Sequence, residues 1–211
     1  MAEDIVVVGA GGHCRTLLSI LRYYEQFSVV GIADREIETI DEEVSGYSVE
    51  YSWNDLCDLY EKGTRYAVIA IGNNTKRKEL LAELSRIGFS VPTIVHPTAI
   101  IEQDAEIGQS NVVCMGAKIG TKVSIGRNCV VYTGSNIDHE VQVCDHVFIA
   151  PGCNIAGRVK IGEGSFVGIG STIKEKIVVG SNAVIGAGSV VIRDVPDHEV
   201  VAGVPAKNVG R

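Results

Sequence analysis

A regular pattern of apolar and polar positions runs from Ala99 to Asp194 and repeats every six residues. Read from Ala99, the stretch divides into 16 hexads without a break, with Ile or Val third in every hexad and Gly fourth in seven. An α-helix repeats its apolar residues about every 3.6 positions and a half-buried strand about every two. A period of six fits neither. It predicts a parallel β-helix, in which each hexad forms one flat face and one corner.

The pattern also predicts how this β-helix is packed. The β-branched third residue should point inward and stack on its equivalent in the next coil, with small residues beside it. Glycine at the fourth position is expected to allow the tight corner. Three hexads make one triangular coil of about eighteen residues, so the stretch holds a little over five coils.

Upstream of the repeat, short apolar runs alternate with segments of helical spacing. We expect helices after the first run, from Asn54 to Tyr60, and from a Thr75 cap to Ile87, whereas residues 36–52 look irregular. This alternation predicts a small doubly wound α/β domain, Rossmann-like, over residues 1–95, followed by the β-helix over 96–211. Buried strands are expected at residues 5–8, 29–33, 66–71 and 89–95.

A glycine-rich turn, Gly9 to His13, joins the first strand to the first helix. Glycines let backbone N–H groups approach an anion, and the helix N-terminus adds a partial positive charge. Gly11, Gly12 and His13 are therefore candidates for binding a phosphate or sugar. Cys14 replaces the third glycine of a dinucleotide fingerprint, so a tight turn without a ligand remains the alternative.

Polar residues also follow the next two strands of the predicted sheet. Asp34 and Arg35 end one strand, and Gly72 and Asn73 end another. Ligands of open α/β sheets bind at the carboxyl ends of the strands, although turn chemistry alone also explains Asn73. A single mononucleotide-binding half suits a nucleotide-linked substrate better than NAD.

His139 and Glu140 interrupt the usual corner composition of the β-helix. His139 is fifth in its hexad, and Gly157, eighteen residues on, leaves open space beside the imidazole. An imidazole oriented by a carboxylate has what a general base needs. The alternative is a solvated corner with no chemistry.

Composition and charge exclude several classes of function. The net charge of −7 and the lack of a dense basic run argue against nucleic acid as a partner. No apolar run approaches the roughly 20 residues of a membrane span, and the acidic start lacks the basic residues of a signal peptide. The six cysteines form no CxxC pair, so we expect no metal site, free thiols and a cytoplasmic location.

The whole chain resembles the hexapeptide-repeat sugar acetyltransferases that carry an N-terminal nucleotide-sugar domain. These include bacterial UDP-4-amino-sugar and GDP-perosamine N-acetyltransferases and sialic acid O-acetyltransferase relatives. The resemblance implies a left-handed β-helix and homotrimers with sites between subunits. The matching stretches are Gly9 to His13, Asp34, Gly72-Asn73, His139-Glu140, Ala150-Pro151-Gly152, Gly157 and Gly203 to Lys207.

The resemblance also assigns roles to residues of this chain. His139 would take a proton from the substrate amine as that amine attacks acetyl-CoA directly, and Glu140 would orient His139. The CoA arm would lie along Gly168-Ile169 and Gly186-Ala187, which are eighteen residues apart. Plain corner glycines are the alternative there.

One position departs from the family pattern, because Phe148 stands where many members have a histidine near the thioester. His146 lies two residues earlier and receives no catalytic role. The tail from Val195 to Arg211 breaks the repeat and is expected to cap the β-helix.

The predicted function is N-acetylation of a UDP- or GDP-linked amino-sugar from acetyl-CoA, for surface glycan biosynthesis. O-acetylation of a sugar such as a sialic acid is the alternative within catalysis. A nucleotide-sugar-binding protein without activity is the alternative outside it.

Overall fold

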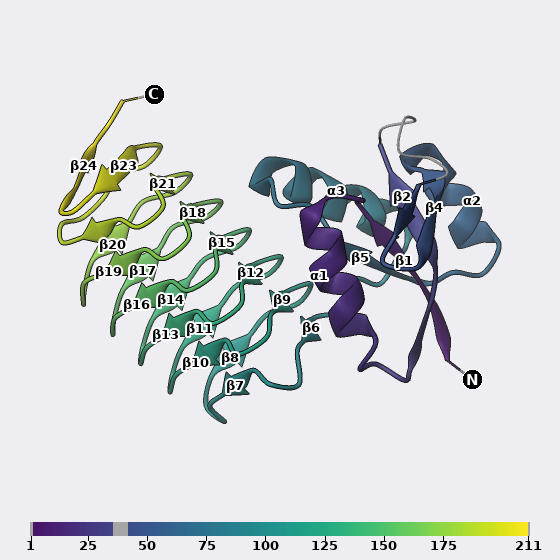
Figure 1. Ribbon diagram of the computed structural model, residues 1–211, viewed down its shortest axis with the longest axis horizontal. Helices are drawn as coiled ribbons and strands as arrows, with labels where there is room; N and C mark the ends of the chain where they lie inside the picture. Colours follow the sequence, from purple (N-terminus) through teal and green to yellow (C-terminus); the bar gives the residue numbers. More distant parts are fainter. Residues whose placement is uncertain (1, 36–41, 211) are drawn as a thin grey trace. The chain divides into compact units, whose positions relative to one another are not determined.

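The computed structural model describes residues 2–35 and 42–210. The chain forms two compact units, one ending at Ile94 and the other beginning at Val95. Figure 1 shows an α/β unit in purple and blue and a coiled stack of short strands in green and yellow. Each unit is described by itself below.

The first unit is built on a five-stranded sheet with the order β3-β4-β2-β1-β5. Strands β1, β2, β4 and β5 are parallel, and β3 pairs antiparallel with β4. The strands are β1 (Glu3–Val8), β2 (Phe27–Asp34), β3 (Glu43–Val44), β4 (Tyr47–Ser52) and β5 (Tyr66–Ile69).

Helices follow β1, β4 and β5, as expected of a doubly wound unit. Leu80 and Leu84, one turn apart on the last helix, join a core that includes Val6 and Val8 of the central strand. The helices are α1 (Gly12–Leu21), α2 (Leu56–Glu61), which follows a 3-10 turn (Trp53–Asp55), and α3 (Asn74–Ile87).

Several predicted boundaries were wrong. Asn73, rather than Thr75, caps α3: its side-chain oxygen accepts a hydrogen bond from the Lys76 N–H at 3.0 Å. Asn54 does not cap the second helix, because Ser52 and Asp55 form a capping box one turn earlier. The strand expected at residues 89–95 shortens to β6 (Ile94–Val95) and one bridge at Ser90.

The prediction that residues 36–52 are irregular was also wrong for residues 42–52, which the structure describes. Val44 pairs with Tyr47 across Ser45 and Gly46, which have φ values of 54° and 89°. Positive φ at both central residues is typical of a tight hairpin turn. Residues 36–41 lie outside the described residues.

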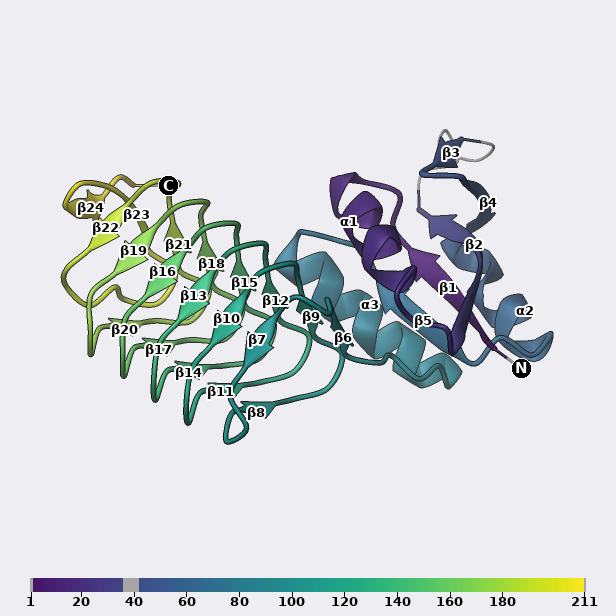
Figure 2. The same cartoon turned by 60° about the horizontal axis from the view of Figure 1, so that its bottom comes forward.

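The second unit is a parallel β-helix whose three faces are three sheets (Figure 2). From β7 to β22, strands of neighbouring coils pair at a spacing of eighteen residues, for example Ile119 with Ile137. One sheet has the order β22-β19-β16-β13-β10-β7, the second β20-β17-β14-β11-β8, and the third β24-β23-β21-β18-β15-β12-β9-β6.

Two residues of each hexad form each short strand. The strands are β7 (Ile100–Ile101), β8 (Glu106–Ile107), β9 (Val112–Val113), β10 (Lys118–Ile119), β11 (Ser124–Ile125), β12 (Val130–Val131), β13 (Asn136–Ile137), β14 (Gln142–Val143), β15 (Phe148–Ile149), β16 (Asn154–Ile155), β17 (Lys160–Ile161), β18 (Phe166–Val167), β19 (Thr172–Ile173), β20 (Val178–Val179), β21 (Val184–Ile185) and β22 (Val190–Val191).

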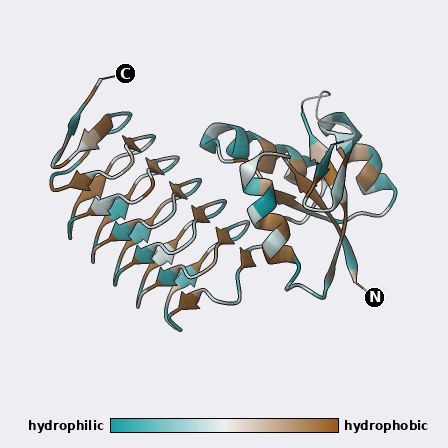
Figure 3. Cartoon of the chain, viewed as in Figure 1, coloured by the Kyte–Doolittle hydropathy of each residue, from teal (hydrophilic) through white to brown (hydrophobic). Residues whose placement is uncertain are grey.

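The predicted core of the β-helix is confirmed. The third residue of the hexad is buried in all coils except the first, where Ile101 and Ile107 are half-buried. These two lie on β7 and β8, which end their sheets and have a neighbouring strand on one side only. Figure 3 shows both colours along the β-helix strands, because the two strand residues face opposite ways.

The fourth-position glycines are not needed for the backbone conformation of the corner, contrary to expectation. Left-handed φ falls on the sixth residue of the hexad, as at Lys122, Glu140 and Arg158. The fourth-position glycine is needed because the next coil passes close by: a Cβ on Gly162 would lie 2.5 Å from the carbonyl carbon of Gly180.

The tail covers the last coil of the β-helix. β23 (Val200–Gly203) continues the third sheet beside β21, and β24 (Ala206–Asn208) folds back on it antiparallel. This hairpin pairs the edge that the last full coil would leave open.

Candidate active site

His139 and Glu140 meet at one corner of the β-helix, between β13 and β14. His139 Nδ1 lies 3.0 Å from Glu140 Oε2, and both side chains are 43% exposed. An ionised carboxylate only accepts hydrogen bonds, so Nδ1 carries the proton and Nε2 keeps its lone pair. This arrangement can take a proton at Nε2.

The imidazole lies over Gly157 of the next coil. A Cβ on Gly157 would come within 2.4 Å of His139 Nε2 and 2.5 Å of Cε1. The absence of a side chain there therefore creates the space that the ring occupies, as the sequence predicted. The Asp138 side chain fixes the main chain of His139 as well, because its Oδ1 accepts a hydrogen bond from the His139 N–H at 2.8 Å.

A third charged residue at this corner was missed by the sequence analysis. Arg158 Nε donates to Glu140 Oε2 at 2.9 Å, so one carboxylate oxygen accepts from both His139 and Arg158. Hydrogen bonds from His139 and Arg158 hold the pKa of the Glu140 carboxyl below its usual range. The signal was present in the repeat, because Arg158 is eighteen residues after Glu140.

The α/β unit brings its predicted ligand residues to one edge of the sheet. β1 lies between β2 and β5, so the turn after β1, Asp34 and Gly72 all leave neighbouring carboxyl ends. Asp34 Oδ2 accepts a hydrogen bond from the Ala10 N–H at 2.5 Å and so ties the glycine-rich turn to β2. The chain reverses its strand order at this point, where open α/β sheets bind ligands.

Gly11 and Gly12 are exposed at the start of α1. A Cβ on either would meet no atom within 4 Å, and neither has a left-handed φ. Packing therefore does not require glycine at these two positions, and the helix N-terminus is open to a ligand. Asn73, by contrast, has a structural use as the cap of α3.

His13 and Arg77 lie deeper in the same unit. His13 is 8% exposed, and burial together with the charge of Arg77 lowers the pKa of its imidazole to about 4. His13 is thus neutral near pH 7, so it cannot neutralise a phosphate. Arg77, 1% exposed, donates to the carbonyls of Ile71 and Gly72 at 3.4 and 3.3 Å and was not predicted.

Arg35 lies against an aromatic ring rather than at the glycine-rich turn. Its guanidinium carbon is 5.8 Å from the ring centroid of Trp53. The two residues line a cavity of about 670 Å³ together with Ser52, Asn54, Glu79, Leu80 and Glu83.

The residues expected to hold CoA lie on a different corner of the β-helix from His139. Gly168-Ile169 and Gly186-Ala187 connect the third sheet to the first, whereas His139 connects the first sheet to the second. The N–H groups of Gly168 and Gly186 donate to the next coil, at 2.8 Å in both cases. Ile169 and Ala187 are exposed beside them.

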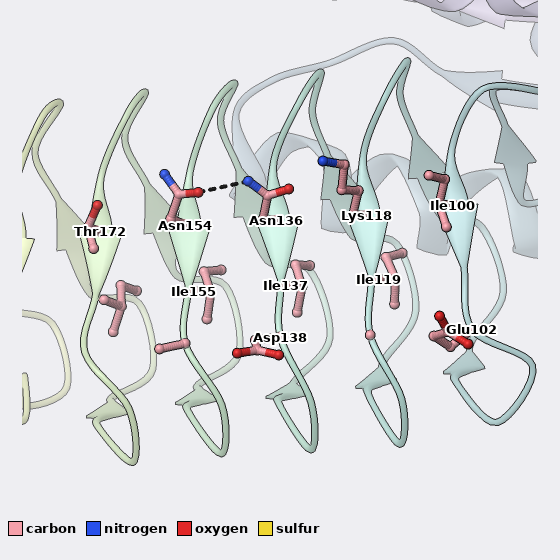
Figure 4. Close-up of a pocket in the computed structure, with 13 residues that line it drawn as sticks. Ile100, Glu102, Lys118, Ile119, Asn136, Ile137, Asp138, Asn154, Ile155 and Thr172 are labelled. Carbon is pink, nitrogen blue, oxygen red and sulfur yellow. Dashed lines mark hydrogen bonds between the residues drawn. The ribbon is translucent and has the colours of Figure 1, made fainter.

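The first sheet separates these two corners and carries a groove of about 460 Å³. Figure 4 shows Ile100, Lys118, Asn136, Asn154 and Thr172 in one row across its strands. The side chain of Asn136 donates to that of Asn154 at 2.8 Å. Asp138, next to His139, lines the same groove.

Phe148 and His146 are both buried and contact other side chains of the β-helix. Phe148 stacks on Phe166 with ring centroids 5.4 Å apart, and Tyr132 lies 5.7 Å away on its other side. His146 is 4% exposed, and its Nδ1 lies 2.8 Å from Asn128 Nδ2. Neither residue shares the corner of His139.

The cysteines, all within the described residues, are dispersed along the chain and form no disulfides. All six cysteines are free, and burial raises the pKa of the Cys14 and Cys114 thiols to about 12. Within residues 2–35 and 42–210, no three His, Cys, Asp or Glu side chains gather as a metal site would require. None of the helices in these residues has the length and apolar character to cross a membrane.

Comparison with known proteins places both units in one group of enzymes. Residues 4–84 match the PglD N-terminal domain, and residues 158–193 match the bacterial transferase hexapeptide family. UDP-N-acetylbacillosamine N-acetyltransferase of Bacillus subtilis is 31% identical over 112 residues. These residues are 53% of this chain and 51% of that protein, so the match spans about half the length of each.

Solved structures also match over nearly the whole chain. A mutant of perosamine N-acetyltransferase from Caulobacter crescentus, in complex with CoA and GDP-perosamine, is 30% identical, with a TM-score of 0.94 over 100% of this chain and 99% of that one. The acetyltransferase domain of PglB from Neisseria gonorrhoeae, in complex with acetyl coenzyme A, is also 30% identical, with a TM-score of 0.90 over 99% and 100%.

These matches confirm the expected fold, an N-terminal α/β domain followed by a left-handed β-helix. They cover the glycine-rich turn and the His139 corner alike. The chain belongs to the hexapeptide-repeat sugar acetyltransferases with a PglD-type N-terminal domain.

Proposed function

We propose that this protein transfers the acetyl group of acetyl-CoA to the amino group of a nucleotide-linked amino-sugar. The observation that carries the proposal is the His139 corner: Nδ1 faces Glu140 at 3.0 Å, and Nε2 lies over Gly157. Support also comes from the relatives that act on UDP- and GDP-linked sugars.

In this reaction the free-base amine attacks the thioester carbonyl directly. As the C–N bond forms, Nε2 of His139 takes one proton from the amine, and Glu140 stabilises the resulting imidazolium. The tetrahedral intermediate then loses CoA as a thiolate, which receives that proton. No covalent enzyme intermediate is needed, because the amine is itself the nucleophile.

The proposed division of labour follows the two parts of the chain. Residues 1–95 would bind the nucleotide-sugar, with Gly11, Gly12, Asp34 and Gly72 at the switch point of the sheet. His13 and Asn73 would act mainly by holding the turn and α3 in place. Residues 96–211 would bind acetyl-CoA and carry out the transfer.

The proposed assembly is a homotrimer whose sites lie between subunits. In one chain, His139 and the corner of Ile169 and Ala187 lie at opposite edges of the first sheet. A second copy can bring its Ile169 corner to the His139 corner of the first. Acetyl-CoA and free thiols suit a cytoplasmic location.

The test is thiol release from acetyl-CoA with a panel of UDP- and GDP-linked amino-sugars, using wild type and His139→Ala. We expect thiol release with one of the amino-sugars, and its rate should fall by about 10²- to 10⁴-fold in the variant. Release with a sialic acid alone would favour O-acetylation. Binding of a nucleotide-sugar without any transfer would favour the binding-protein alternative.

A further inference from the structure

Glu140 receives two hydrogen bonds on one oxygen, and only one of them comes from the residue it was expected to orient. His139 Nδ1 lies at 3.0 Å and Arg158 Nε at 2.9 Å from Oε2. We propose that Arg158 is a positioning residue for the His139–Glu140 pair. This inference rests on the proposed function of that corner.

The backbone fixes Arg158 in the right place to do this. Arg158 is the sixth residue of its hexad, as Glu140 is, and lies one coil further on. Its N–H donates to the His139 carbonyl at 3.0 Å. Arg158 thus contacts His139 through the main chain and Glu140 through the side chain.

The guanidinium limits the conformations of an exposed carboxylate. Glu140 is 43% exposed on a corner, where a glutamate side chain would otherwise sample several rotamers. A charge-assisted bond from Arg158 keeps Oε2 toward Nδ1. The imidazole then keeps its proton on Nδ1, which leaves Nε2 unprotonated for the substrate.

Other charged groups along this corner are neighbours of the pair rather than partners in it. Asp138 accepts from the His139 N–H, and Asp104 accepts from Thr121 Oγ1 at 2.6 Å. The remaining charged residues at equivalent corner positions of nearby coils are Glu102, Lys122, Lys174, Glu175 and Lys176.

A matched control exists on a different corner of the β-helix. Arg127 Nε donates to Asp145 Oδ2 at 3.0 Å, also across eighteen residues and also between exposed side chains. Arg127→Met therefore removes an ion pair of the same kind without touching His139. Arg158→Lys keeps a cation near Glu140 and serves as the conservative variant.

The experiment uses the full-length protein and two readouts. Nitrogen-15 NMR of the His139 ring, assigned by its loss in His139→Ala, reports which nitrogen carries the proton and needs no substrate. In Arg158→Met we expect the Nδ1–H tautomer to fall toward a mixture, with kcat about 3- to 10-fold lower and KM unchanged. Arg158→Lys should restore part of both, and Arg127→Met should change neither.

An unchanged tautomer in Arg158→Met, or an equal change in Arg127→Met, would overturn the inference. Failure of wild type to acetylate any amino-sugar would instead count against the proposed function. The NMR readout still decides the role of Arg158 in that case.

Discussion

At the scale of single residues, one missing side chain decides where the imidazole of His139 lies. The main-chain hydrogen bonds at this corner repeat from coil to coil, as from the Arg158 N–H to the His139 carbonyl. Gly157, however, opens a space that Thr121, at the same corner position one coil before His139, does not. The sequence predicted this, because residues eighteen apart stack. The same count leads from Glu140 to Arg158, so this partner was available from the sequence as well.

Gly157→Ala is expected to displace the imidazole without unfolding the β-helix. The new Cβ would come within 2.4 Å of Nε2, and the exposed ring can move aside. Because a misplaced base contributes little, kcat should fall by about 10²-fold. Steady-state kinetics measure this, with the thermal midpoint as the folding control. Full activity in a folded variant would contradict the proposed position of the base.

The burial of Arg77 was not predictable from the sequence. The sequence predicted a helix through this residue but gave the residue itself no role, and it is 1% exposed. Burial of this side chain depends on strand ends that lie beside α3 only after the sheet has formed. The sequence therefore could not place its charge next to His13.

At the scale of elements, the start of α1 combines an open helix end with a buried histidine. Gly11 and Gly12 are exposed, whereas His13 and Cys14 pack inward. Desolvation favours the neutral form of a buried imidazole. The turn that is proposed to bind the nucleotide-sugar is therefore linked to pH through its own stability.

The stability of the α/β unit should fall as pH falls from about 6.5 to 4. The pKa of His13 is lowered to about 4, so in this window the unfolded chain binds a proton that the folded chain does not. Protonation of His13 in the unfolded chain should lower the free energy of unfolding by about 3 kcal/mol as the pH falls across this window. Above pH 6.5 the imidazole is neutral in both states, so this loss is absent there. Urea unfolding followed by the fluorescence of Trp53, the single tryptophan, measures it.

The matched variants are His13→Gln and His198→Gln, since His198 is exposed. His13→Gln should lose this part of the pH dependence, and His198→Gln should keep it. Equal slopes in wild type and His13→Gln would contradict the buried neutral imidazole.

The six-residue period predicts the direction of side chains in the β-helix but not the reason for each corner glycine. The period correctly predicted the inward Ile and Val residues, because side-chain direction alternates along any strand. It did not separate the two uses of glycine at a corner. Close approach of the next coil at Gly162 and left-handed φ at Gly164 become distinct only when the coils are built.

At the scale of the whole molecule, the two halves of the proposed site lie on different corners of one β-helix. His139 belongs to the corner after the first sheet, and Ile169 to the corner before it. A homotrimer would join one corner from each of two copies. Activity would then be a property of the assembly rather than of one chain.

Mixed assemblies of two inactive variants should therefore regain activity. In His139→Ala the base is lost, and in Ile169→Glu a carboxylate repels the phosphates of CoA from an exposed position. With equal random mixing, half of the His139 corners and half of the Ile169 corners are intact. About a quarter of the sites therefore pair two intact corners. Thiol release after co-expression with two affinity tags measures the recovery.

The control mixes His139→Ala with Gly157→Ala, which changes the same corner. This pair should stay as inactive as its parts, because no site receives an intact His139 corner. Recovery in the control, or its absence in the test pair, would contradict sites between subunits.

The sequence by itself determined the β-helix, its eighteen-residue coil, its core and the His139 corner, because each follows from a local period. It also determined the doubly wound unit, from the alternation of apolar runs and helical segments. Only the tertiary structure decided that Arg77 is buried beside His13, and that the Glu140 carboxylate accepts from His139 and Arg158 through one and the same oxygen. Burial and side-chain direction at those two places depend on residues that are distant in the chain or in adjacent coils, and a local pattern gives neither.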